Sequence, residues 1–234
     1  MRSFVHPAKP LLLPYLVLLL LGCLLMPGCN TSDESSNQVT TADPTPPVTA
    51  APGNQSQERS TAATDTVDFE KAFQQFFAAL QAADTAALQQ FIHPAHGLWI
   101  IEQPGAVPKM THVQHIGQFK REYQDRSFLT VKDEVQQCNL AEEPFPKFDC
   151  ADMEGGRTGY SKDGCFAWNA DKFKQSGYWD YASLSDEQMR QVKNTLPLVQ
   201  KSVLHTKTSF EFHFGYVDGH WRLLFAKLIY PCSA

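Results

Sequence analysis

The sequence predicts an α+β domain, in which amphipathic helices at the start pack against antiparallel strands at the end. An aromatic stripe with helical spacing follows Val67, and apolar residues alternate on both sides of Asp218-Gly219. A third observation limits the domain to part of the chain. The first 66 residues divide into an apolar leader and a polar segment, so only residues 67–234 have the composition of a folded domain.

The first helix of the domain is defined by its phenylalanines. Large apolar residues recur three or four positions apart, which places them on one helical face: Phe69, Phe73, Phe76, Phe77 and Leu80. Asp84 is suited to cap a short second helix, because its carboxylate can accept from free backbone amides. Leu88 and Phe91 of that helix then face the core.

The middle of the domain has weaker patterns. Leu98 to Ile101 is expected to be a buried strand, about Val113 to Tyr123 an amphipathic helix, and Phe128 to Val135 a strand. Residues 138–181 are rich in Gly, Pro, Asp and Lys, which indicates an irregular insertion. Ser185, followed three residues later by Gln, is the capping box of one more helix.

The C-terminal hairpin has the clearest local signal. Asp218-Gly219 suits the positive φ angles of a type I′ turn between two alternating strands. The simple register pairs these residues across the hairpin: Val217 with His220, Tyr216 with Trp221, Phe214 with Leu223, and Phe212 with Phe225. It also turns Lys227 inward opposite Phe210, unless a bulge shifts the phase.

This order of elements resembles the NTF2-like (cystatin-like α+β cone) superfamily. The resemblance rests on the opening stripe from Phe69 to Phe91 and on the closing segment Val217-Asp218-Gly219-His220-Trp221-Arg222-Leu223. It spans most of residues 67–234, with about 138–181 as an insertion. It implies N-terminal helices packed on a curved antiparallel sheet. The superfamily contains enzymes and binding modules, so the fold does not select an activity.

The leader indicates export. Arg2 and Lys9 precede an apolar run of sixteen residues, Leu11 to Met26. At ~1.5 Å per residue the run reaches about 24 Å, less than the ~30 Å of a bilayer core. A secretory signal is therefore favoured over a permanent membrane span.

The end of the leader resembles the lipobox of bacterial lipoproteins, which places a small residue before a lipid-carrying cysteine. We expect Cys29 to carry the lipid, because Gly28-Cys29 opens directly into polar sequence. Cys23, after Gly22, is the alternative, and an ordinary cleaved signal peptide is a third. The resemblance implies a signal peptide at 1–28 and a lipid anchor in the bacterial cell envelope. The outer membrane is favoured, with the domain facing the periplasm or the surface.

Residues 29–66 are rich in Ser, Thr, Gln, Asn, Pro and Ala. Such a segment buries too little apolar surface to offset its ordering entropy, so we expect a disordered tether.

Four cysteines lie in the folded part, and an even number in an exported domain favours two disulfides: Cys138, Cys150, Cys165 and Cys232. We expect Cys138 to pair with Cys150 and Cys165 with Cys232, although three pairings exist. A four-thiolate zinc site is the alternative, but the spacing lacks a Cys-x2-Cys pair.

Two groups of residues are candidates for a binding site. Aromatic residues crowd the 138–181 segment and form a candidate binding face: Tyr160, Trp168, Tyr178, Trp179 and Tyr181. The alternative is that these rings roof the cone and complete the core. Lys227, on the last strand, is a candidate polar element of the cone pocket. Two histidine pairs are weak metal candidates: His93 with His96, and His112 with His115. Exposed loop histidines are the plainer interpretation.

Several classes of function are excluded or unsupported. The net charge is −5 and the sequence has no basic run, which argues against nucleic acid as a partner. It has no Gly-rich phosphate loop, no Gly-x-Ser-x-Gly motif and no evident acid–base pair, so we expect no cofactor. We expect a non-enzymatic module that binds a protein, glycan or small ligand. The alternative is an isomerase-like or dehydratase-like enzyme, or a carrier, using the cone pocket.

Overall fold

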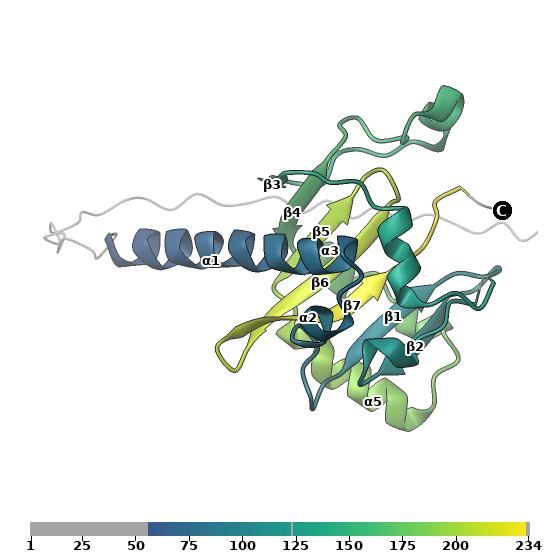
Figure 1. Cartoon of the computed structure of the whole chain (residues 1–234), viewed down its shortest axis with the longest axis horizontal. Coiled ribbons are helices and arrows are strands. Elements are labelled where there is room, and N and C mark those ends of the chain that lie inside the picture. Colours follow the sequence, from purple (N-terminus) through teal and green to yellow (C-terminus); the bar gives the residue numbers. More distant parts are fainter. Residues whose placement is uncertain (1–55, 123, 233–234) are drawn as a thin grey trace, which may run out of the picture. The chain divides into compact units, whose positions relative to one another are not determined.

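The structure is a computed structural model that describes residues 56–122 and 124–232 (Figure 1). They belong to one unit, Pro52–Ala234. A seven-stranded sheet with helices packed on both faces makes an α+β fold, as predicted. The expected signal peptide, both candidate lipidation cysteines and most of the expected tether lie outside the described residues.

The strands lie in the order β2-β1-β7-β6-β5-β4-β3. Their bounds are Leu98–Glu102 (β1), Lys109–Val113 (β2), Leu140–Glu142 (β3), Cys165–Asn169 (β4), Lys201–His205 (β5), Phe210–Val217 (β6) and His220–Lys227 (β7). The pairs β1–β7 and β3–β4 are parallel and the other four are antiparallel. The sheet is therefore mixed, and the prediction of a wholly antiparallel sheet is wrong.

The helices have the following bounds: Ser56–Gln81 (α1), Thr85–Gln89 (α2), Asp171–Lys174 (α3), Tyr178–Tyr181 (α4) and Asp186–Thr195 (α5). Helix α1 begins before the domain boundary expected at Val67. The predicted capping box of α5 is confirmed, with the Ser185 hydroxyl accepting from the Gln188 amide. Within the described ranges no helix has both the length and the apolar character needed to cross a bilayer.

Helix α1 covers one face of the sheet, here called the phenylalanine face after Phe210, Phe212 and Phe214 of β6. The predicted stripe of α1 is confirmed, because all five of its large apolar side chains are buried in this core. Phe76 illustrates the packing: its ring centroid lies 5.2 Å from that of Phe212 and 5.3 Å from that of Phe214. The Asp84 cap is also confirmed, since its carboxylate accepts from the amides of α2.

The hairpin forms as predicted near its turn, with Tyr216 opposite Trp221 and Phe214 opposite Leu223. Beyond that point the register shifts between His213 and Phe214, with one extra residue, Leu224, in β7. Phe212 therefore pairs with Ala226, and the predicted pairing with Phe225 is wrong.

The same shift changes the position of Lys227, which lies opposite Glu211 rather than Phe210. Because successive strand residues point to opposite sides, Lys227 and Glu211 face away from α1. We call this side the second face of the sheet.

Two predicted elements in the middle of the domain are wrong. The helix expected over Val113–Tyr123 is instead the end of β2 followed by a 3-10 turn at Ile116–Gln118. The strand expected over Phe128–Val135 is a 3-10 helix, Phe128–Asp133. Phe128 and Val131 are the buried residues of that helix, and their spacing of three matches the 3-10 repeat.

The 138–181 segment is not simply an irregular insertion. It contributes β3 and β4 to the sheet and helices α3 and α4 to the second face. The part between β3 and β4, residues 143–164, projects away from the sheet (Figure 1). Helices α3, α4 and α5 and the sheet bury a second core whose largest members are Trp99, Phe173, Trp179 and Phe225.

The predicted cysteine pairing is wrong, although all four cysteines are in disulfides. Cys138 pairs with Cys165, and Cys150 pairs with Cys232. The strand pairing explains the first bridge. The β3–β4 register sets Leu140 beside Cys165, which brings nearby Cys138 to a Cα–Cα distance of 5.7 Å from it.

Candidate functional site

The second face of the sheet carries a pocket of about 240 Å³. We call it the Lys227 pocket. It lies between strands β4 to β7 and helices α3 and α4. Its lining includes Phe145, Trp168, Asn169, Tyr178, Glu211 and Lys227. Apolar walls with a few polar groups are typical of small-molecule sites.

The sheet register brings the polar side chains of this region together. Glu211 and His213 are two residues apart on β6, so they point to the same face. Lys227 is the direct partner of Glu211 on β7, and Ser202 is the direct partner of His213 on β5. Three neighbouring strands thus place four polar side chains side by side.

Lys227 and Glu211 form an ion pair at the pocket wall. Their side chains are only 16% and 17% exposed, and the Lys227 ammonium lies 5.6 Å from the centroid of the Tyr178 ring. Burial by itself lowers the pKa of Lys227. The Glu211 carboxylate and Tyr178 outweigh burial and raise that pKa above its ordinary value, so Lys227 is a cation at neutral pH.

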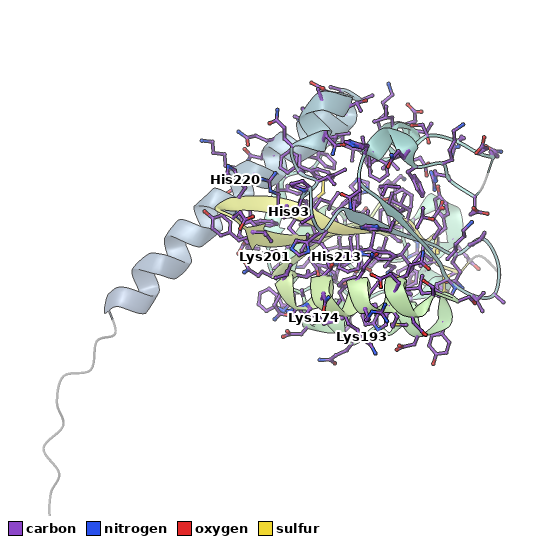
Figure 2. The ribbon with its side chains drawn as sticks, turned by 90° about the horizontal axis from the view of Figure 1, so that it is seen from below. His93, Lys174, Lys193, Lys201, His213 and His220 are labelled. Atoms are coloured by element: carbon purple, nitrogen blue, oxygen red, sulfur yellow. A yellow bond between two sulfur atoms is a disulfide. The ribbon has the colours of Figure 1, made fainter. Side chains whose placement is uncertain are left out.

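His213 lies behind this pair, fully buried inside the domain (Figure 2). Its Nδ1 is 2.8 Å from the Ser202 hydroxyl, and its ring stacks on Phe173 at 3.5 Å between centroids. Its Nε2 has no hydrogen-bond partner among the described residues and lies 3.8 Å from a Glu211 oxygen. Burial, helped by the charge of Lys227, lowers the pKa of His213 well below its ordinary value, so the ring is neutral.

The structure brings some of the predicted binding residues together and separates others. Trp168, Tyr178 and Lys227 line the pocket. Tyr160 is half-buried, and burial raises the pKa of its hydroxyl. The charge of Lys227 is close enough to lower that pKa by a smaller amount. Trp179 is buried in the second core, and Tyr181 is 68% exposed outside the pocket lining.

The alternative that these rings complete the core agrees with the buried members, although the core they join is the second one. Phe173 and Trp179 pack on the second face, away from the phenylalanine core.

The histidines of the first pair lie close to the hairpin turn. His93 is buried, which contradicts the interpretation of an exposed loop residue for this histidine. Its Nδ1 accepts from the amides of Ala95 and His96, and its Nε2 lies 3.0 Å from the Asp218 carboxylate of the hairpin turn. This contact lowers the pKa of Asp218.

The second histidine pair is divided between a strand and the surface. His112 lies on β2, with its Nε2 2.8 Å from the His96 carbonyl and its ring 4.6 Å from that of Trp99. His115 is exposed. Neither pair belongs to a cluster of metal-ligand type in the described part of the chain.

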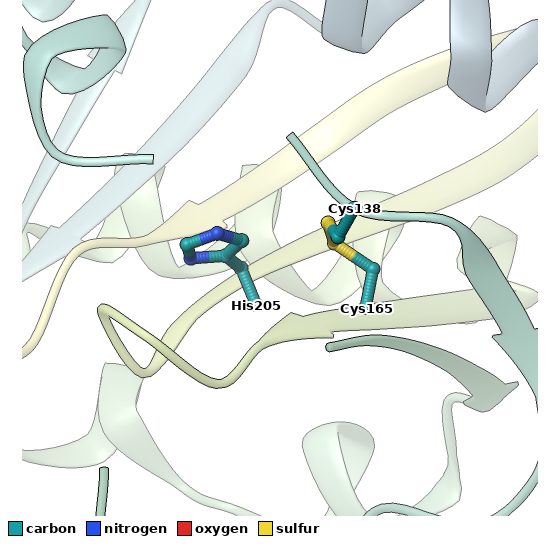
Figure 3. A group of neighbouring side chains, drawn as sticks. All are labelled: Cys138, Cys165 and His205. Carbon is teal, nitrogen blue, oxygen red and sulfur yellow. A yellow bond between two sulfur atoms is a disulfide. The ribbon is translucent and has the colours of Figure 1, made fainter. Parts of the chain in front are cut away.

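One such cluster does occur among the described residues: Cys138, Cys165 and His205 (Figure 3). The two sulfur atoms are bonded to each other, so they are not thiolate ligands. Both ring nitrogens of His205 have partners, with Nδ1 2.8 Å from the Thr208 hydroxyl and Nε2 3.1 Å from the Gln136 carbonyl. In this oxidised form the cluster is a bridge beside a satisfied histidine.

The sequence interpretation missed Glu211, His213 and Ser202 as site residues. A signal for two of them is present, because Glu211 and His213 are the polar residues on the outer side of an otherwise apolar strand. A hairpin with one solvated face explains such residues without a site. Only the helices on the second face make them buried.

Searches among known protein families, curated proteins and solved structures find no match to this chain. The geometry of the pocket therefore carries the functional conclusion.

Proposed function

We propose that this chain is a membrane-tethered binding protein of the bacterial cell envelope, and that its domain holds a small ligand in the Lys227 pocket. The observation that carries the proposal is the largely buried Lys227–Glu211 pair at the wall of an aromatic-lined pocket. Keeping two charges out of water is costly, so such a pair is more readily understood at a site than in a plain core.

The size of the pocket favours a small ligand over a protein partner. Drug-sized ligands occupy pockets of roughly 300–1,000 Å³, and this pocket, at about 240 Å³, suits something smaller.

The protonation states favour binding over catalysis. A general base works best with a pKa near the operating pH. His213 is held neutral and fully buried, and Lys227 is held charged by its partner. His213 and Lys227 therefore offer hydrogen-bonding groups of fixed protonation, and neither exchanges protons readily at neutral pH.

The cell-envelope assignment is supported by the leader, by the Gly-Cys sequence at its end and by the two disulfides. We assign the lipid to Cys29, with Cys23 as the alternative. The α1 stripe packed on the C-terminal hairpin supports the proposed likeness to NTF2-like domains. The mixed sheet and the second layer of helices are features that this likeness did not lead us to expect.

A labelling experiment tests the anchor. Cells expressing the chain are fed an alkynyl palmitate analogue, and the purified protein is probed for the label. Cys29→Ser should remove the label and Cys23→Ser should retain it. Loss of the label in Cys23→Ser instead would assign the lipid to Cys23. A wild-type protein that is secreted without the label would overturn the proposal of a lipid anchor.

A ligand screen tests the pocket. The full chain, purified in detergent, is heated with a panel of neutral, anionic and cationic ring compounds. We expect at least one compound to raise the melting temperature. Trp168→Ala should reduce that rise, whereas Tyr181→Ala, at an exposed aromatic outside the pocket lining, should preserve it. Hits that are insensitive to Trp168→Ala would contradict the assignment of the site.

A second candidate, a small-molecule enzyme at the same pocket, is favoured by one observation. The Ser202 hydroxyl lies 2.8 Å from His213 Nδ1, which is a nucleophile–base arrangement. The 3.8 Å between His213 and Glu211 is too long for the hydrogen bond that would orient the base. Covalent labelling of Ser202 by a fluorophosphonate probe would establish this function, and an unlabelled protein that binds ligands would exclude a nucleophilic Ser202.

A further inference from the structure

We infer that the ligand of the Lys227 pocket is a single neutral, hydroxyl-bearing ring, that is, one sugar unit. The inference rests on the proposed function, because it names the class of ligand for the same pocket. Three features carry it: the charges at the pocket wall, the aromatic side chain at its edge and the pocket volume.

The Lys227–Glu211 ion pair disfavours an ionic ligand. Glu211 supplies a carboxylate acceptor and Lys227 supplies an ammonium donor at one place on the wall. A ligand carboxylate near Lys227 would be repelled by Glu211, and a ligand ammonium near Glu211 would be repelled by Lys227. A hydroxyl suits both groups, because it can donate to the carboxylate while it accepts from the ammonium.

The remaining polar lining extends this pattern. Asn169, Lys172, Ser176 and Ser202 also line the pocket and offer donors and acceptors. Lys172 is exposed, so solvent screens its charge more than the charges of the ion pair. A ligand with a hydroxyl on each of several ring atoms can use such a scattered set. A ligand with one polar group uses only part of it.

The aromatic side chain at the edge of the pocket suits a ring with an apolar face. Trp168 lines the pocket and is 40% exposed, with Phe145 also in the lining. Sugar rings carry C–H groups on their faces and hydroxyls around their edges. One face can therefore pack on the indole while the edge hydroxyls reach the polar groups.

The volume limits the ligand to one ring. About 240 Å³ lies below the range of drug-sized pockets. The exposed edge of Trp168 leaves the pocket open to solvent on that side. A single sugar ring of this kind has two possible sources: a free monosaccharide, or the terminal unit of an envelope glycan.

A titration with matched ligands tests the inference. The full chain in detergent is titrated by saturation-transfer NMR with glucose, galactose, mannose and N-acetylglucosamine. Glucuronate and glucosamine serve as charged counterparts, and benzoate and indole as rings without hydroxyls. We expect at least one neutral sugar to bind saturably and about ten-fold more tightly than its charged counterpart.

Two variants locate that binding. Trp168→Ala should weaken it about ten-fold, and Asn169→Ala, also at an exposed position of the lining, about five-fold. Tyr181→Ala should leave it unchanged. Oligosaccharides ending in the preferred sugar distinguish the sources: equal affinity identifies a glycan end, and a ten-fold loss identifies the free sugar.

Two outcomes overturn the inference in different ways. If a charged or hydroxyl-free ring binds in a Trp168-dependent manner and no neutral sugar does, the sugar assignment fails while the pocket remains a binding site. If no compound of any class binds in a Trp168-dependent manner, the proposed function fails with it.

Discussion

The two faces of the sheet carry different kinds of side chain, although the same strands form both. On the phenylalanine face, Phe210, Phe212 and Phe214 meet the stripe of α1 in a core of apolar side chains. On the second face, the intervening residues of β6 include Glu211 and His213, both largely buried under short helices. Both faces bury apolar side chains, but the polar groups that suit a ligand are on the second face.

A single extra residue makes this separation complete. Leu224 shifts the phase of β7, so that Lys227 points to the second face and meets Glu211. Without the shift, Lys227 would point into the phenylalanine core, where a charge has no partner among the phenylalanines. A bulge that moves a side chain from one face to the other is a known use of this irregularity near functional sites.

The largest effect should come from the phenylalanine face. Phe76→Ala removes a fully buried ring that contacts Phe91, Phe212 and Phe214. We expect a loss of about 4 kcal/mol in the free energy of unfolding, because the transfer energy of the ring and a cavity both contribute. Denaturant unfolding measures this loss. A loss below about 1 kcal/mol would mean that this face is not the main core.

The ion pair of the second face should come next. Glu211→Gln leaves the Lys227 ammonium buried without its carboxylate, which should cost about 3 kcal/mol. The double variant Glu211→Gln, Lys227→Met removes both charges and should recover part of that loss. Equal losses in the single and double variants would show that the charge pairing is not the cause.

The pH dependence should follow the buried histidines. Burial lowers the pKa values of His213 and His205. As the pH falls below about 6.5, the unfolded chain takes up protons that these folded histidines do not. Stability should therefore decrease, with a slope of up to about 1.4 kcal/mol per pH unit for each histidine. Glu102, whose pKa burial raises, has the opposite sign and acts at lower pH.

Unfolding curves at pH 7.5, 6.5 and 5.5 test this prediction. His213→Asn should flatten the slope, whereas His115→Asn, at an exposed position, should not change it. Lys227 does not contribute in this range. Its pKa is raised in the folded state, so its stabilisation is full below about pH 10.4 and is lost only at higher pH. An unchanged slope in His213→Asn would assign the effect to His205 and to His96, whose pKa burial also lowers.

Trp168→Ala should have the smallest effect on stability and a large effect on ligand binding. Trp168→Ala, at a partly exposed position of the second face, should change the free energy of unfolding by less than about 1 kcal/mol. The same variant should weaken ligand binding about ten-fold. A stability loss as large as that of Phe76→Ala would place Trp168 in the core and remove it from the site.

The elements that could be predicted from the sequence are those with a strong local cause. The α1 stripe, the Asp84 cap, the Ser185 capping box and the Asp218-Gly219 turn depend on residues a few positions apart. The errors concern long-range pairing. Strand β2 was not predicted, because it depends on pairing with β1, and the cysteine pairing depends on how β3 meets β4.

The site divides in the same way. The sequence by itself identified Trp168, Tyr178 and Lys227 as candidates, because crowded aromatic residues and a basic residue in an apolar strand are visible in one dimension. Only the tertiary structure decided that Lys227 meets Glu211 and that His213 is buried beside Ser202. The physical reason is that burial on the second face comes from α3, α4 and α5. Their packing on the strands depends on contacts between residues tens of positions apart, and no local pattern encodes them.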